Sequence, residues 1–151
     1  MTQFATYADL LNAITDENGR EILNPATGEV VGRVPEGSVE DLNAAVETAR
    51  AAQKDFAKLS DEERCELLTK VAAAVEANAE ALVELLSREQ GKPLNGPNAR
   101  FEVGACSGWL NATASFEHPN YTAVDDDITA TVNYRPLGVV GAIGPWNWPM
   151  M

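Results

Sequence analysis

The sequence predicts an α/β protein, and three observations support that class. Two short strand-like stretches lie near the N-terminus, a long middle region has helical periodicity, and residues 137–143 are almost wholly apolar. Apolar side chains at three- and four-residue intervals are typical of amphipathic helices, whereas a continuous apolar run is typical of a strand covered on both faces of a parallel sheet. We therefore expect short strands, then a helical cluster, then one parallel strand.

The strand pair is expected before residue 35. Residues 21–23 and 30–34 stand on either side of Asn-Pro-Ala-Thr-Gly, in which Pro25 and Gly28 supply turn chemistry. Two short strands joined by this turn are the expected result.

Residues 38–90 are expected to be helical. Ser38 and Ser60 are each followed three residues later by an acidic side chain, which is a capping-box pattern at a helix start. Asn78 is of a type favoured at helix N-caps, and would divide the second stretch into two helices. Gly91, with a proline two residues later, ends the region.

A further helix is expected from Asn98 to about residue 116. Two glycines inside it, Gly104 and Gly108, each cost about 1 kcal/mol relative to alanine, so we expect another segment to pack close to them. One face of this helix is predicted to be apolar, formed by Phe101, Ala105, Trp109, Ala112 and Phe116.

The last zone carries the most information. Residues 128–134 alternate between apolar and polar side chains, which predicts a half-exposed strand. Residues 137–143 then predict a buried parallel strand, yet parallel strands occur in series with crossover helices and only eight residues follow. We therefore expect that the sequence is the N-terminal part of a longer chain, or a product that stops early.

Composition and charge exclude several classes of partner. The 151 residues include 23 acidic and 11 basic side chains, for a formal net charge of -12. Such a surface repels nucleic acid and anionic membranes, and no apolar stretch approaches the roughly 20 residues of a membrane span. The start of the chain lacks the pattern of a signal peptide, and two cysteines make no disulfide framework. We expect a cytoplasmic protein with no nucleic-acid or membrane partner.

The isolated reactive residues give little indication of chemistry. Acidic neighbours of Cys65 oppose a thiolate, and Cys106 fits a small packing residue better than a nucleophile. His118, the single histidine, lies in a predicted loop, and its spacing from the cysteines is not that of a metal site. We expect no metal.

Residues 144–149, Gly-Pro-Trp-Asn-Trp-Pro, form a stiff loop at the carboxyl end of the expected parallel strand. Open α/β sheets bind ligands at that end. Asn147 could direct an amide N–H at a developing negative charge, as in an oxyanion hole. The alternative is that Trp146 and Trp148 are core residues and that Asn147 forms a turn.

Four segments together resemble the N-terminal portion of the aldehyde dehydrogenase superfamily. They are ILNPATGEVVGRVP, SVEDLNAAVETARAA, LSREQGKPL and, most specifically, PLGVVGAIGPWNWPMM, in the order that the family has them. The resemblance runs from about Ile22 to the last residue. It implies oxidation of an aldehyde to a carboxylic acid with NAD or NADP as cofactor, and a homo-oligomer when the protein is full length.

The resemblance also implies roles for individual residues. Asn147 matches the asparagine whose side-chain amide binds the thiohemiacetal oxyanion. Gly144, Pro145 and Trp146 match the stretch beside the nicotinamide end of the cofactor cleft, and Trp148 matches an aromatic position at the substrate tunnel.

The same resemblance divides the chain into three parts. Residues 1–124 would be the N-terminal part of the cofactor-binding domain, residues 125–136 the strand of an oligomerisation arm, and residues 137–151 the start of a Rossmann-like parallel sheet with the oxyanion loop. The catalytic domain, with the family's cysteine nucleophile and glutamate base, would be absent. We therefore expect no aldehyde oxidation by this chain alone.

Two other interpretations remain open. The chain could be a truncated, non-catalytic paralogue that acts as an interaction module, pairing the free edge of residues 137–143 with full-length subunits. It could also be a partly unfolded remnant, because a parallel strand without neighbours is unstable.

Overall fold

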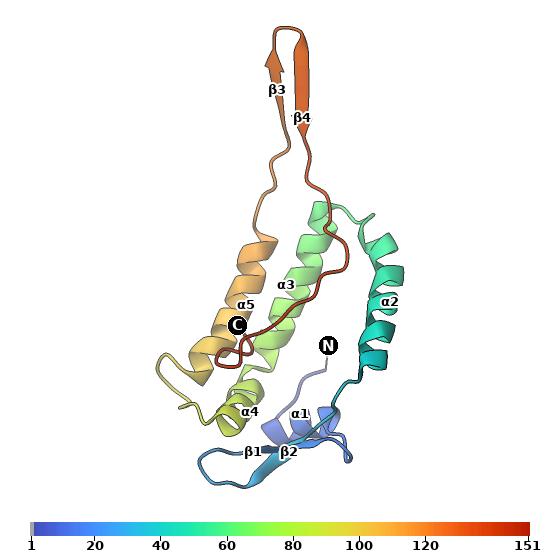
Figure 1. The fold of residues 1–151 in the computed structure, drawn as a ribbon. Helices are drawn as coiled ribbons and strands as arrows, with labels where there is room; N and C mark the ends of the chain where they lie inside the picture. Colours follow the sequence, from blue (N-terminus) through green and yellow to red (C-terminus); the bar gives the residue numbers. More distant parts are fainter. Residues whose placement is uncertain (1) are drawn as a thin grey trace.

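Five helices and two separate two-stranded sheets make up residues 2–151, which are the residues that the computed structural model describes. In Figure 1, α3 and α5 run side by side, α1 and the first sheet lie at one end of the molecule, and the second sheet projects from the other. The elements are α1 (Tyr7–Ile14), β1 (Arg20–Leu23), β2 (Val30–Val34), α2 (Val39–Phe56), α3 (Asp61–Ala77), α4 (Ala79–Gln90), α5 (Ala99–Ala114), β3 (Tyr121–Asp125) and β4 (Ile128–Val132).

The expected N-terminal strand pair is confirmed. β1 and β2 are antiparallel, with Arg20 opposite Val34 and an irregular register next to Leu23. Gly28 has φ +75° in the connecting turn, a conformation that glycine adopts without strain. Helix α1, which starts at a capping box formed by Thr6 and Asp9, was not expected from the sequence.

Both predicted capping boxes are formed. The Ser38 hydroxyl accepts from the Asp41 backbone N–H at 3.1 Å, and the Ser60 hydroxyl accepts from the Glu63 backbone N–H at 3.1 Å. Each carboxylate in turn accepts from the backbone N–H of its serine. The hydrogen bonds that each carboxylate accepts from its serine, from the backbone N–H first and the hydroxyl second, lower the pKa of Asp41 and Glu63, because they stabilise the charged form.

Asn78 divides the helical run as expected, but it does not cap α4. Its side chain makes no capping hydrogen bond. Instead its Nδ2 donates to the Ala74 carbonyl at 2.8 Å, and its Oδ1 accepts from the Phe4 backbone N–H at 2.7 Å. Residues near the start of the chain therefore occupy the Asn78 amide in place of the α4 backbone, and this attaches them to the junction between α3 and α4.

Gly91 ends α4, also as expected. It has φ +69°, and its backbone N–H donates to the Ser87 carbonyl. A Cβ atom at this position would lie 2.7 Å from Cγ of Pro25, in the turn between β1 and β2. Close approach and left-handed backbone both require glycine here.

The core lies where α4 meets α5, and it uses a different face of α5 from the one predicted. The core side chains are Val83, Leu86, Ala99 and Val103, with Met150 and parts of α3 and α4 packed against them. Phe101 and Trp109, on the predicted apolar face, are 53% and 63% exposed. The error arises because α5 carries apolar residues on several faces, and α3 and α4 cover the side that contains Val103.

The close packing expected at Gly104 and Gly108 is likewise not found among residues 2–151. A Cβ atom at either glycine would meet nothing within 4 Å. No described segment covers the side of α5 on which they lie.

The projecting sheet consists of β3 and β4, antiparallel with Tyr121 opposite Val132. β4 corresponds to the strand expected within residues 128–134, whereas β3 was not predicted from the sequence. Every residue of both strands is exposed, so β4 is uncovered on both faces rather than on one. At the base of this hairpin the His118 ring stands edge-on between Phe116 and Tyr134, with centroid distances of 5.0 and 5.2 Å.

The predicted parallel strand over residues 137–143 is not formed. This stretch forms no regular secondary structure, has a bend at Val139 and a φ of +92° at Gly138, and passes across α3 in Figure 1, with Leu137 and Ile143 almost fully exposed at 93% and 99%. The physical reason is that the described residues contain no neighbouring strand with which its backbone could pair. A hollow of about 900 Å³ separates residues 139–142 from the apolar side of α2, where Leu42 is 64% exposed.

No helix within residues 2–151 has the length and apolar character needed to cross a membrane.

Candidate functional site

The loop predicted to carry chemistry, residues 144–149, reaches the first turn of α5 at its carboxyl end, where Trp148 contacts Phe101 and Met150 follows. In Figure 1 the dark-red end of the chain returns from the hairpin and finishes beside α5. Met150 is half-buried and packs against the core cluster. The end of the loop is thus held by the helices rather than left free.

Glu102 is the centre of this attachment. It is completely buried in the first turn of α5, and its Oε1 accepts from the Met150 backbone N–H at 2.8 Å. Its Oε2 forms an ion pair with Nζ of Lys92. The helix N-terminus and the ammonium group together compensate the buried negative charge.

Lys92 connects the same carboxylate to Asn147. Its Nζ also donates to the Asn147 backbone carbonyl, and lies 4.6 Å from the centroid of the Trp148 ring. The other contact of that indole is with Phe101, edge to face at 5.9 Å. Trp148 is therefore held between a cation and an aromatic ring.

The side chain of Asn147 is available. Asn147 is exposed, and among residues 2–151 its side-chain amide forms no hydrogen bond. Its main chain is bound by Lys92 while the residue is exposed to solvent. An amide donor on an anchored backbone can bind a negatively charged oxygen with little reorganisation.

The other predicted site residues lie farther from this attachment. Gly144, Pro145 and Trp146 are exposed, and the Trp146 side chain is 86% accessible. Trp148 is half-buried. The structure thus brings Asn147 and Trp148 together with Lys92, and leaves residues 144–146 as an open stretch of backbone and indole surface.

Sequence reasoning missed both Lys92 and Glu102. A signal for Glu102 is present, because it lies three residues after Ala99 and next to Val103, on the buried face of α5. A carboxylate in that pattern requires a partner. Nothing in the local sequence indicates that the partner is Lys92.

Two further groups are influenced by the buried Glu102. Burial, with the Glu102 charge as a smaller cause, raises the pKa of the Cys106 thiol. The same two causes, in the same order, raise the pKa of the Glu89 carboxyl. A raised thiol pKa reduces the thiolate fraction, so Cys106 is a poor nucleophile, in agreement with its predicted packing role.

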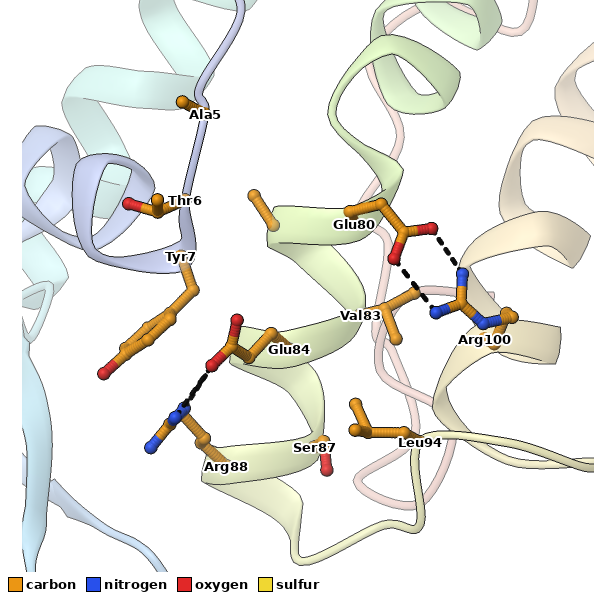
Figure 2. A pocket seen from close by; sticks show the side chains of 11 residues that line it. Ala5, Thr6, Tyr7, Glu80, Val83, Glu84, Ser87, Arg88, Leu94 and Arg100 are labelled. Atoms are coloured by element: carbon orange, nitrogen blue, oxygen red, sulfur yellow. Dashed lines mark hydrogen bonds and ion pairs between the residues drawn. The ribbon is translucent and has the colours of Figure 1, made fainter.

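A separate hollow of about 400 Å³ lies between α1, α4 and the start of α5 (Figure 2). Its cations are already paired. Arg88 binds Glu84 and stacks 4.2 Å from the Tyr7 ring centroid, and Arg100 forms an ion pair with Glu80. These charges satisfy one another, so the hollow has the character of a contact between elements.

Metal ligands are not gathered in the described part of the chain. No group of three or more His, Cys, Asp or Glu side chains within residues 2–151 could hold a metal ion.

Five helices with two short antiparallel sheets make up a small α/β fold. Residues 13–151 match the model of the aldehyde dehydrogenase family. The chain belongs to the aldehyde dehydrogenase family.

Similar proteins include enzymes that use either nicotinamide cofactor. The chain is 35% identical over 134 residues to succinate-semialdehyde dehydrogenase [NADP(+)] 2 of Schizosaccharomyces pombe, a match covering 85% of this chain and 27% of that one. It resembles a glyceraldehyde-3-phosphate dehydrogenase from Methanocaldococcus jannaschii complexed with NADP, with a TM-score of 0.81, 29% identity, and coverage of 91% of this chain and 30% of that one. For a Staphylococcus aureus betaine aldehyde dehydrogenase in complex with NAD+, the TM-score is 0.79 at 26% identity, covering 91% and 28% of the two chains.

The chain therefore spans less than a third of the length of these relatives. The expected family and the expected fold class, part of an aldehyde-dehydrogenase-like α/β fold, are both confirmed by these matches.

Proposed function

We propose that this chain is the N-terminal portion of an NAD(P)-dependent aldehyde dehydrogenase, and that it supplies the oxyanion donor through Asn147. The observation that carries the proposal is the combination of an anchored Asn147 main chain with an exposed Asn147 side chain. The family membership and the NADP- and NAD-bound relatives support the reaction class.

The role of Asn147 follows from the chemistry of aldehyde oxidation. When a thiolate adds to an aldehyde carbonyl, the carbonyl oxygen becomes an oxyanion. A side-chain N–H placed about 2.7–3.1 Å from that oxygen stabilises it, and losing one such donor costs about 10²- to 10³-fold in rate. The Asn147 amide donates in this way, while Lys92 keeps its backbone in place.

The residues before Asn147 fit the edge of a cofactor site and no more. Gly144, Pro145 and Trp146 offer an exposed backbone and an exposed indole, which suit the flat nicotinamide ring. The cation that contacts this loop, Lys92, is engaged by Glu102, so within residues 2–151 the loop offers no free positive charge for the cofactor phosphates. When bound, the cofactor would accept hydride from the aldehyde substrate. We assign Trp148 to the substrate tunnel.

The chain alone is proposed to be inactive. Its two thiols do not suit the nucleophile's role, since Cys106 has a raised pKa and Cys65 lies among acidic side chains. We assign the nucleophilic cysteine and the glutamate base to family sequence that follows the region matched here.

The remaining assignments concern the arm and the compartment. We assign residues 1–124 to the cofactor-binding domain, residues 125–136 to an arm that joins subunits of a homo-oligomer, and residues 137–151 to the sheet and oxyanion loop. The apolar side chains exposed on the β3–β4 hairpin, including Val124 and Ile128, support the arm. Two free cysteines suit a reducing compartment, so we place the protein in the cytoplasm.

The decisive experiment compares Asn147→Ala with Asn43→Ala in a dehydrogenase that carries this chain as its N-terminal portion. We expect Asn147→Ala to lower kcat about 10²- to 10³-fold, because the oxyanion loses a donor. Asn43, exposed on α2, should be replaceable without effect. Unchanged kcat in Asn147→Ala, or cofactor reduction by residues 1–151 alone, would contradict the proposal.

A second candidate function has one observation in its favour. Residues 137–143 are exposed and pair with no strand within residues 2–151, so their backbone could add to the edge of another subunit's sheet. In that case the chain is a non-catalytic interaction module for full-length subunits. Co-purification of residues 1–151 with an intact dehydrogenase, lost on Val140→Pro, would favour this function; recovery of the chain alone would count against it.

A further inference from the structure

We propose that Lys92 and Glu102 are positioning residues that hold the Asn147 loop in its working geometry. This inference rests on the proposed function, because it concerns how Asn147 is aimed. It adds two residues that were not among the predicted site residues and that do not themselves touch the reacting atoms.

The contacts form a closed connection around four residues. From the Asn147 carbonyl the connection runs to Nζ of Lys92, then to the carboxylate of Glu102, and returns to the chain at the Met150 backbone N–H. The Met150 end of the 147–150 segment is thus attached directly to Glu102 in the first turn of α5, and the Asn147 end is attached to the same carboxylate through Lys92. A main chain fixed at both ends fixes the direction of the Asn147 Cα–Cβ bond, from which the side-chain amide extends.

Shielding from water makes this connection firm. Glu102 is fully buried and the Lys92 side chain is 17% exposed, so solvent competes weakly for the bonds that Glu102 makes with Lys92 and Met150, whereas the bond from Lys92 to the Asn147 carbonyl is exposed. Charge-assisted hydrogen bonds of this kind are stronger than neutral ones, and they are stronger still at low local dielectric. The exposed pair of Glu80 and Arg100, which joins α4 to α5, lacks this shielding.

Stability alone does not account for a buried ion pair at this place. Replacing such a pair with apolar side chains of similar size is often neutral or stabilising, because the charges no longer have to be desolvated. What an apolar pair cannot do is bind the Asn147 carbonyl and the Met150 N–H. The directional bonds of Lys92 and Glu102 therefore serve the loop.

Contacts of the Trp148 ring further restrict the orientation of the loop next to Asn147. Its ring lies between Nζ of Lys92 and the edge-on ring of Phe101, so the residue next to Asn147 cannot turn without losing both contacts. Catalytic groups must be held within about 0.5 Å of the productive geometry. A displacement of about 1 Å costs on the order of 10²-fold in rate.

The first test measures the attachment in this chain without any assay of activity. Lys92→Met combined with Glu102→Leu removes both charges together and leaves no unpaired buried ion. We expect amide hydrogen exchange at Met150 to become at least about tenfold faster, with Val103 in the core still protected. The matched control, Glu80→Gln with Arg100→Met, should leave Met150 unchanged. Unaltered protection of Met150 in the Lys92/Glu102 variant would overturn the proposal.

The second test asks whether the pair acts through Asn147. In a dehydrogenase carrying this chain, the Lys92→Met/Glu102→Leu variant should lower kcat about 10²-fold with KM within about twofold, and Lys92→Arg should retain most of the activity. On an Asn147→Ala background the same double substitution should cause no further loss. If the double substitution lowered kcat as much on the Asn147→Ala background as it does alone, the positioning role would be wrong.

The two proposals can fail separately. If Asn147→Ala leaves kcat unchanged, the oxyanion role is wrong, whatever exchange at Met150 shows. If Asn147→Ala is slow but the Lys92/Glu102 variant retains full kcat, the oxyanion role stands and the positioning role is wrong.

Discussion

The backbone N–H of Met150 donates a 2.8 Å hydrogen bond to Glu102, a residue 48 positions earlier in the chain. Met150 also packs against the core between α4 and α5. The Asn147 loop and the helical core consequently share one buried carboxylate. Changes that loosen α5 should therefore disturb the loop, even when they lie outside it.

The stability of the chain should depend on the small core and not on the apolar face of α2. Leu86 is 2% exposed, and we expect Leu86→Ala to lower the free energy of unfolding by about 2–5 kcal/mol, because it leaves a cavity. Leu42 is 64% exposed, so Leu42→Ala should change it by less than about 0.5 kcal/mol. Urea denaturation of residues 1–151 measures both. Equal effects would mean that α2 is packed as tightly as α4.

The capping box at Ser60 should make helix α3 sensitive to acid. Its hydrogen bonds hold the pKa of Glu63 below its ordinary value of 4.5. A carboxyl with a lowered folded-state pKa contributes stability above its unfolded pKa, and that contribution is lost as the pH falls through the folded-state pKa. By NMR titration, Ser60→Ala should raise the pKa of Glu63. The pKa of Asp41, in the separate box at Ser38, should not move, and a parallel rise there would indicate a general effect.

Cys106 should react slowly with alkylating agents. Burial and the Glu102 charge raise its pKa, so less thiolate is present at a given pH. In a Cys65→Ala background at pH 8, we expect iodoacetamide to modify Cys106 roughly 3- to 10-fold more slowly than the same thiol in urea. Glu102→Gln should recover part of the rate, since it removes the smaller of the two causes. Equal rates in the folded and unfolded chain would contradict the shift.

The β3–β4 hairpin should determine the oligomeric state of a dehydrogenase that contains this chain. Val124 and Ile128 are 70% and 68% exposed, and both would be buried if the hairpin joins subunits. Replacing both with lysine should reduce the molar mass in light scattering to that of a smaller assembly. Asn43→Lys with Thr48→Lys, at exposed polar positions of α2, adds the same charge and should leave the mass unchanged. An unchanged mass in the Val124/Ile128 variant would exclude the arm.

Features set by neighbouring residues could be predicted from the sequence. The boxes at Ser38 and Ser60 depend on a partner three residues away, and the helix end at Gly91 depends on its own backbone conformation. The strand pair β1–β2 depends on one short turn. Each of these is confirmed, because the interacting groups lie within a few residues of one another.

Features set by distant residues could not be predicted. The apolar residues of α5 lie on several of its faces. Their periodicity alone therefore does not indicate that α3 and α4 cover the face with Val103 rather than the face with Trp109. Asn78 has the composition of a cap, but its side chain is taken by Phe4, 74 residues away. At the candidate site, the motif around Asn147 indicates the loop, while its attachment to Lys92 depends on the folded chain.

Gly91 and Gly28 share a left-handed backbone but differ in their tolerance of mutation. A side chain at Gly91 would collide with the rigid Pro25 ring as well as strain the backbone, whereas a Cβ at Gly28 meets nothing within 4 Å. Asparagine and aspartate adopt the left-handed conformation more readily than other residues. In a saturation library, position 28 should accept those two residues, whereas position 91 should accept glycine alone. Substitution should thus be tolerated at Gly28, at the tip of the first hairpin, but not at Gly91, where the end of α4 contacts Pro25 of that hairpin.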